Sequence, residues 1–198
     1  TDMTAIKLGI IGGSTVTELA QAELKEELLP ETPFGQLAHP IRKYKHQNAE
    51  FYFLHRHGEG HVIPPSDINY RANIFALKKL GVTHVLSVSA VGSLREEMRP
   101  GDIVLPDQYI DWTRGVRARS FFGQNSVGHV SSADVASKEL TKNIQDICEE
   151  LSVRHHVGGS YICIEGPQFS SRAESHLFRS FGASVIGMTN LPEAYLAY

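Results

Sequence analysis

Short apolar runs alternate with amphipathic stretches along this chain, and the alternation predicts an α/β fold. Four apolar or β-branched runs predict buried strands, at 6–11, 83–91, 161–164 and 185–188. Because these runs show no polar face, we expect each strand to be covered on both sides. Helical patterns separate them, so we expect one central mixed β-sheet flanked by helices.

Turn residues and helical spacing locate the other elements. The expected helices are 67–81, 133–151 and 171–181, followed by a last helix with Pro192 in its first turn. The expected shorter strands are 41–45, 50–54, 103–105 and 109–112, of which the first two pair in antiparallel fashion. The segments 28–40 and 113–132 show no clear period, and the second is basic and aromatic, which is typical of a functional loop.

The composition is that of a globular protein, and it excludes some functions. Of the 198 residues, 41% are hydrophobic and 21% are charged, and a net charge of −3 argues against a general nucleic-acid binder. No run approaches the roughly 18 apolar residues of a membrane span. The two cysteines, Cys148 and Cys163, suit buried thiols in a reducing compartment. We therefore expect a single cytoplasmic domain over 1–198, without a signal peptide, a nucleic-acid partner or a membrane segment.

Candidate chemistry is concentrated where the predicted strands end. Small hydroxyl residues, glycines, one arginine and one histidine follow these strands: Gly12, Gly13, Ser14, Arg56, His57, Ser89, Ala90 and Thr189. Ligands of α/β proteins bind at the carboxyl ends of the strands. Oxyanions are bound there by the two-pronged guanidinium of arginine, by hydroxyl groups and by backbone N–H groups that glycine leaves accessible. The pattern therefore indicates an anion site. Each piece also has a purely structural interpretation, such as a helix cap or turn for Thr189.

The motif LHRHGEGH at 54–61 admits two interpretations. His55 and His57 point to the same side of a strand, as two metal ligands would. Arg56 stands between them, however, and a guanidinium beside a metal ion costs Coulomb energy unless carboxylates compensate. The arginine therefore favours an anion site over a metal site, and we expect His55 to pack on the sheet and His61 to sit in a loop. No metal is expected.

A second candidate follows the strand at 161–164. Gly166-Pro167 breaks the chain there, and Phe169 lies in the next loop, where an aromatic ring can stack on a planar ligand. Packing in the core is the alternative for this ring. Glu174, in the helix that follows, is expected on a solvated or ion-paired face.

Several blocks of the sequence resemble one family. They are GIIGGS (9–14), TPFG (32–35), RHGEGH (56–61), IEGPQFSSRAES (164–175) and VIGMT (185–189). In this order and spacing they resemble the 5′-methylthioadenosine phosphorylases, in the trimeric branch of the purine nucleoside phosphorylases. A relative acting on methylthioinosine shares most of the blocks. The resemblance runs over nearly the whole chain and implies a purine nucleoside phosphorylase-like fold.

The resemblance also implies a reaction and a set of site residues. Inorganic phosphate would displace the purine of 5′-methylthioadenosine, giving free base and 5-methylthioribose 1-phosphate in purine and methionine salvage, with no cofactor. The implied phosphate ligands are Ser14, Arg56, His57, Ser89, Ala90 and Thr189, with the catalytic set Ser14, Arg56, His57 and Ser89. The implied nucleoside contacts are Val91, Gly92, Phe169, Ile186, Met188 and His129. His129 would be lent to the neighbouring subunit of a homotrimer.

Two departures from the family pattern leave alternatives open. Gly187 stands where the family commonly has asparagine, which weakens the adenine assignment. We also expect the chain, ending at Tyr198, to lack the C-terminal segment that meets the purine. One alternative is a phosphorylase of methylthioinosine or of ordinary purine nucleosides such as inosine and guanosine. The others are an inactive nucleoside-binding form and a metal-dependent hydrolase built on the histidines.

Overall fold

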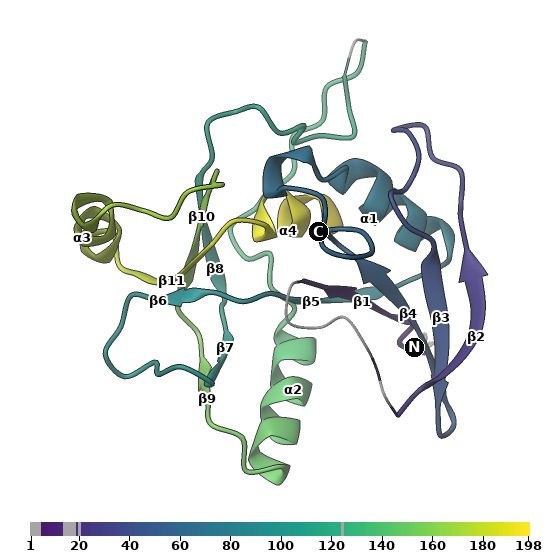
Figure 1. The fold of residues 1–198 in the computed structure, drawn as a ribbon, viewed down its shortest axis with the longest axis horizontal. Helices are drawn as coiled ribbons and strands as arrows, with labels where there is room; N and C mark the ends of the chain where they lie inside the picture. The colour runs from purple at the N-terminus through teal and green to yellow at the C-terminus, as the bar shows by residue number, and fades with distance from the viewer. Residues whose placement is uncertain (1–4, 14–18, 20, 124) are drawn as a thin grey trace. The chain divides into compact units, whose positions relative to one another are not determined.

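The computed structural model describes residues 5–13, 19, 21–123 and 125–198. The chain divides into two units, residues 1–90 with 197 and residues 91–196 with 198, and each is described by itself (Figure 1). Mixed β-sheet and helices occur in the fold, so the predicted α/β class is confirmed, with the strands distributed over three sheets. The expectation of a single domain over 1–198 stays a prediction.

The first unit contains a five-stranded sheet with the order β2-β3-β4-β1-β5. Its strands are β1 (Leu8–Gly12), β2 (Glu23–Leu28), β3 (Ile41–His46), β4 (Ala49–His55) and β5 (His84–Val88). β1 pairs in parallel with β4 and β5, and the predicted antiparallel pair of β3 and β4 is confirmed. The edge strand β2 was not predicted, because it is mostly charged and exposed and so shows no hydrophobic pattern.

One helix of the first unit packs on this sheet. α1 (Tyr70–Lys79) follows a short 3₁₀ turn, η1 (Pro65–Asp67), and begins after Asn69, whose side chain caps the N–H of Ala72 at 3.1 Å. Leu77 lies 3.3 Å from the point where Gly9 in β1 would carry a Cβ. The helix therefore sits directly on the strand, and a side chain at position 9 would push it away.

The second unit contains a four-stranded sheet, β6-β11-β10-β8, and a two-stranded sheet, β7-β9. Its strands are β6 (Gly92–Ser93), β7 (Ile103–Leu105), β8 (Gln108–Trp112), β9 (His155–Val157), β10 (Ser160–Ile164) and β11 (Ala183–Gly187). Its helices are α2 (Lys138–Glu150), α3 (Arg172–Ser180) and α4 (Asn190–Ala197). The described residues of 113–132 form no helix or strand, as predicted.

The strand β10 illustrates why apolar residues occupy both faces of this sheet. Successive side chains of a strand point to opposite faces. Ile162 packs in a cluster with Phe178 of α3, whereas Tyr161 and Cys163 pack in another with Leu191 of α4. Each face of β10 is thus covered by a helix, which is the arrangement that the continuous apolar run predicted.

Helix ends differ from the predicted ones for local reasons. α2 begins five residues later than predicted, because Ser137 caps it by accepting the N–H of Leu140 at 3.1 Å. α3 begins after Ser171, which forms a capping box with Glu174. Glu174 was expected on a solvated face; it is exposed, but its carboxylate also accepts the Ser171 N–H at 3.2 Å.

Both cysteines are free and buried, as the sequence predicted. Burial raises the pKa of the Cys163 thiol to about 11. In the described part of the chain, no helix combines the length and apolar composition needed to cross a membrane.

Candidate functional site

The first part of the candidate site lies at one edge of the five-stranded sheet. β4, β1 and β5 are parallel neighbours, so their carboxyl ends meet at the same edge. Two hydrogen bonds join the chain just beyond these ends: Arg56 N–H donates to the Gly12 carbonyl at 3.0 Å, and Gly13 N–H donates to the Val88 carbonyl at 3.0 Å. The expectation that these strand ends gather is therefore confirmed.

Arg56 is the centre of this edge. Its side chain is buried, with 1% of the residue exposed, and its guanidinium is held in a fixed direction. Nη1 donates to the Val88 carbonyl at 3.1 Å, and Nη2 donates to the Ser87 hydroxyl at 2.6 Å. The structure therefore holds a permanent positive charge where three strands end.

Gly13 is needed for this packing. A Cβ at position 13 would lie 2.7 Å from Nη1 of Arg56 and 3.0 Å from the Val88 carbonyl oxygen. Any side chain here would displace the guanidinium or the backbone. The Gly-Gly turn that the sequence singled out thus makes room for the arginine.

Ser87 holds the Arg56 side chain and is a candidate site residue that the sequence analysis missed. The predicted residue is Ser89, but the hydroxyl that contacts Arg56 belongs to Ser87, two positions earlier in β5. Ser89 is half-buried and Ala90 is exposed, just beyond the end of the strand. The two-residue spacing of the serines in LSVS was the available signal, since it places both side chains on one face. The remaining predicted phosphate residue of this edge, Ser14, lies outside the described residues.

His57 follows Arg56 and is held in the turn that begins there. The residue is buried, and its Nδ1 lies 2.8 Å from the Ile63 carbonyl oxygen. Because a carbonyl only accepts, Nδ1 carries the proton in this contact. The His61 ring lies beside it, with 4.1 Å between ring centroids, and His61 itself has a positive φ of 55°. The prediction that His61 sits in a loop is confirmed.

His55 packs on the sheet, as predicted. Its ring contacts Phe53 and His39, and its Nε2 accepts a hydrogen bond from Arg42 at 3.3 Å. Burial lowers the pKa of His55, and the neighbouring His39 and Arg42 lower it further, so the neutral ring is favoured. Within the described ranges, no three histidine, cysteine or carboxylate residues are grouped so as to bind a metal ion.

A separate group of predicted site residues lies within the second unit, at the end of β11. Gly92 in β6 pairs with Ile186, and a Cβ at Gly92 would lie 2.9 Å from the Ile186 side chain. Met188 follows the strand, and its sulfur lies 2.6 Å from the point where Gly166 would carry a Cβ. The structure therefore brings Gly92, Ile186, Met188 and the turn at Gly166 together, with Val91 next to Gly92 and partly exposed.

Two of the predicted nucleoside-contacting residues lie on exposed loops and not at the end of β11. Phe169, in the loop before α3, is 88% exposed, and His129 is exposed in the loop 113–132. Core packing, the alternative for Phe169, is therefore wrong. An exposed aromatic ring on a loop suits contact with a ligand or another chain.

Thr189 stands at the N-cap position of α4, but its side chain makes no capping hydrogen bond. Its backbone N–H instead donates to the Tyr161 hydroxyl at 3.3 Å. Thr189 is therefore the N-cap residue by position, as the structural interpretation expected, but its side chain does not cap the helix.

A buried arginine in the long loop was also missed. The Arg117 side chain has no exposed surface, and it donates to the Leu191 carbonyl at 2.7 Å and to the Glu165 carbonyl at 3.0 Å. These contacts join the loop 113–132 to the end of β10 and to the start of α4. The sequence shows three arginines between 114 and 119, and it contains no sign of which one is buried.

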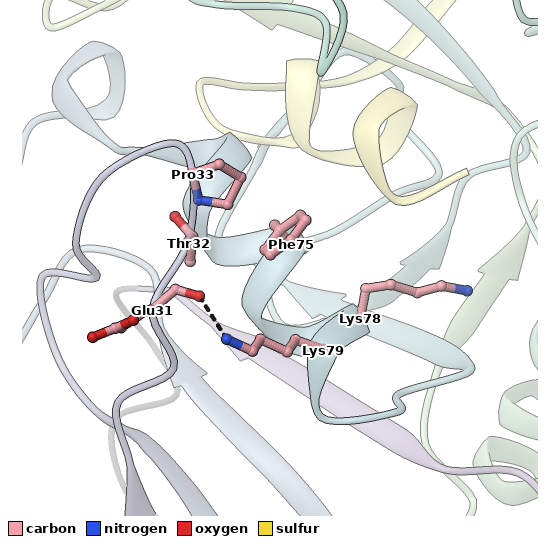
Figure 2. Close-up of a pocket in the computed structure, with 6 residues that line it drawn as sticks. All are labelled: Glu31, Thr32, Pro33, Phe75, Lys78 and Lys79. Carbon is pink, nitrogen blue, oxygen red and sulfur yellow. Dashed lines mark hydrogen bonds between the residues drawn. The ribbon is translucent and has the colours of Figure 1, made fainter.

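A separate hollow in the first unit involves none of the predicted residues. It lies between the loop after β2 and α1, and Figure 2 shows its lining: Glu31, Thr32, Pro33, Phe75, Lys78 and Lys79. Lys79 Nζ donates to the Glu31 carbonyl at 3.1 Å across it, while Lys78 points away (Figure 2). One lysine is thus used to join helix and loop.

Comparison with known proteins places these features in one family. The family model of the phosphorylase superfamily matches residues 7–198. The S-methyl-5′-thioadenosine phosphorylase of Geobacter sulfurreducens is 50% identical over 190 residues, covering 96% of this chain and 66% of that protein. That of Hyperthermus butylicus is 50% identical over 191 residues, covering 96% and 69%. The chain spans about two thirds of the length of these curated relatives.

Solved structures agree. Methylthioadenosine phosphorylase from Schistosoma mansoni in complex with adenine superposes with a TM-score of 0.92 at 34% identity, covering 97% of this chain and 76% of that one. A methylthioadenosine phosphorylase from an antarctic soil metagenomic library gives 0.89 at 45% identity, covering 98% and 68%. The predicted purine nucleoside phosphorylase-like fold is confirmed.

Proposed function

Since the chain belongs to the phosphorylase superfamily, and within it to the S-methyl-5′-thioadenosine phosphorylases, we propose that it carries out phosphorolysis of 5′-methylthioadenosine. One observation in this chain carries the proposal. The buried guanidinium of Arg56 is fixed between Gly13 and the end of β5, where three parallel strands end. A fixed cation beside bare backbone and hydroxyls is suited to an inorganic phosphate.

In the proposed reaction, phosphate replaces the purine at C1′ of the ribose. The C1′–N9 bond breaks with its electron pair leaving on the base, and a phosphate oxygen forms the new C1′–O bond. The sugar passes through an oxocarbenium-like state, and the phosphate charge stabilises it before capturing it. Arg56, His57, Ser89, the Ala90 N–H, Ser14 and Thr189 hold the phosphate in this proposal. His57 is proposed to orient the anion and not to act as a general base, because phosphate is already an adequate nucleophile. With its Nδ1–H fixed on Ile63, the neutral ring carries its acceptor nitrogen at Nε2, which suits the O–H of a singly protonated phosphate.

The nucleoside contacts are proposed in the same way. Met188 would lie against the ribose, while Val91, Gly92, Ile186 and Phe169 would line the base site. In a homotrimer, His129 would contact the 5′ substituent of the nucleoside bound in the neighbouring subunit. The exposed position of His129 in its loop fits this role. No cofactor enters the reaction, and a cytoplasmic role in purine and methionine salvage completes the proposal.

A base-release assay tests the function. The protein is mixed with 5′-methylthioadenosine with and without inorganic phosphate, and free adenine is measured. Release that requires phosphate supports phosphorolysis, and equal release without phosphate would indicate a hydrolase. Binding of the nucleoside without release of free adenine would indicate an inactive form. Loss of turnover on addition of a chelator would support the alternative of a metal-dependent hydrolase.

Gly187 makes the choice of substrate a separate question, because it departs from the family pattern. The same assay with methylthioinosine, adenosine, inosine and guanosine ranks the candidates by kcat/KM. A higher value for an oxopurine nucleoside than for 5′-methylthioadenosine would replace the adenine assignment.

A further inference from the structure

Gly187, the last residue of β11, lies against the side chain of Tyr161. A Cβ at position 187 would lie 2.0 Å from the hydroxyl oxygen of Tyr161, 2.6 Å from its Cζ and 3.0 Å from its Cε2. These separations are far below van der Waals contact, so no side chain fits at 187 while Tyr161 keeps its position. The Tyr161 hydroxyl therefore occupies the space that a residue at 187 would otherwise use.

Tyr161 has little freedom to move out of this space. It lies in the middle strand β10, is only 1% exposed, and packs with Cys163, Val185 and Leu191. Its ring also lies 6.0 Å from that of Tyr109 on the adjacent strand β8. A tyrosine ring has only two side-chain torsions, and burial on every side fixes both.

The hydroxyl at the end of this ring contacts the turn that leaves β11. It accepts the backbone N–H groups of Thr189 at 3.3 Å and of Asn190 at 3.4 Å. Both contacts are long, but they lie side by side on two consecutive amides. These amides belong to the N-cap residue and the first residue of α4, and N–H groups at a helix start have no partner within the helix. The tyrosine oxygen therefore supplies an acceptor for two of these groups.

From this geometry we propose that Tyr161 is a positioning residue for the phosphate site: its hydroxyl fixes the turn that presents the Thr189 side chain. The inference rests on the proposed function, because it takes Thr189 as a phosphate ligand. Gly187 belongs to the same arrangement, since any larger residue there would displace the Tyr161 hydroxyl oxygen that accepts the N–H groups of Thr189 and Asn190. Thr189 is only 5% exposed and its side chain makes no capping hydrogen bond, so a fixed turn would hold that side chain in one position for the anion.

Tyr161→Phe is the main test, because it removes the oxygen and keeps the ring. Steady-state kinetics with phosphate and 5′-methylthioadenosine varied separately should show a three- to tenfold rise in KM for phosphate and less than a twofold change for the nucleoside. Tyr109→Phe, which removes a hydroxyl from the neighbouring strand, is the matched control and should change neither. Equal rises in both KM values, or no rise for phosphate, would overturn the inference.

Amide hydrogen exchange provides a readout that does not depend on turnover. Thr189 and Asn190 should exchange faster in Tyr161→Phe than in wild type, and inorganic phosphate should slow exchange at these amides only in wild type. Gly187→Ala should accelerate the same amides with Tyr161 still present. Unchanged exchange in both variants would refute the positioning role.

The two readouts separate this inference from the function itself. If wild type releases no base with phosphate, the proposed reaction fails. Protection of Thr189 and Asn190 by phosphate, lost in Tyr161→Phe, would still support the inference, and no protection by phosphate in wild type would overturn it as well.

Discussion

Replacing Arg56 by lysine tests the centre of the candidate site without removing its charge. In the Arg56 guanidinium, Nη1 donates to the Val88 carbonyl at 3.1 Å and Nη2 donates to the Ser87 hydroxyl at 2.6 Å. A lysine ammonium is a point charge and cannot hold both acceptors in the fork geometry while facing an anion. We therefore expect Arg56→Lys to lose one of the contacts to Val88, Ser87 or phosphate.

The size of the effect follows from the contact that is lost. A hydrogen bond to a charged group contributes about 1.5–3 kcal/mol, and 1.4 kcal/mol is a factor of ten in affinity. KM for phosphate should therefore rise roughly ten- to a hundredfold, with KM for the nucleoside nearly unchanged. The assay is base release at saturating 5′-methylthioadenosine with phosphate varied, and then with the concentrations exchanged.

Arg42→Lys is the matched control for this experiment. Arg42 lies in β3 of the same sheet, forms an ion pair with Glu27 at 2.9 Å and donates to His55 at the end of β4, so the variant makes the same arginine-to-lysine change beside the site without touching Arg56 itself. It should leave both KM values unchanged. Parallel rises in the two KM values of Arg56→Lys, or a phosphate KM equal to that of wild type, would refute the role assigned to Arg56.

Two further predictions concern stability. Arg117→Leu leaves the buried Leu191 and Glu165 carbonyls without this donor and removes the charge beside the Glu165 carboxylate, so urea unfolding should show a loss of about 3–5 kcal/mol. Arg119→Leu, at a half-exposed ion pair in the same loop, should cost less than about 1 kcal/mol, and equal losses would contradict the buried position of Arg117. Because burial raises the pKa of Cys163 from 9.0 to about 11, the unfolded thiol ionises first, and the free energy of unfolding should fall as pH rises from about 9 to 11. Urea midpoints across that range should fall less steeply in Cys163→Ala, and identical slopes would argue that the thiol is not buried.

Much of the fold and part of the site could be predicted because they depend on neighbours in the chain. The apolar runs identified β1, β5, β10 and β11, since a strand covered on both faces needs side chains that suit both. The capping residue Ser171 acts on an amide three positions away, so its signal is local and the start of α3 was predicted, whereas the equivalent cap of Ser137 was missed. The gathering of Gly13 and Arg56 at one edge is not local, but it could be predicted from topology, because neighbouring parallel strands end on the same side of a sheet.

The contacts that complete the site were decided by the tertiary structure. The period of β5 puts Ser87 and Ser89 on one face, but only the arrival of Arg56 from β4 selects Ser87 as its partner. The sequence alone offers no structural account of glycine at 187, whereas the structure shows that a Cβ there would lie 2.0 Å from the hydroxyl of Tyr161 on the adjacent strand. The amino-acid order thus determined which faces and strand ends carry chemistry. Which atoms meet there depends on distances across neighbouring strands, and those distances exist only once the sheets have formed and packed.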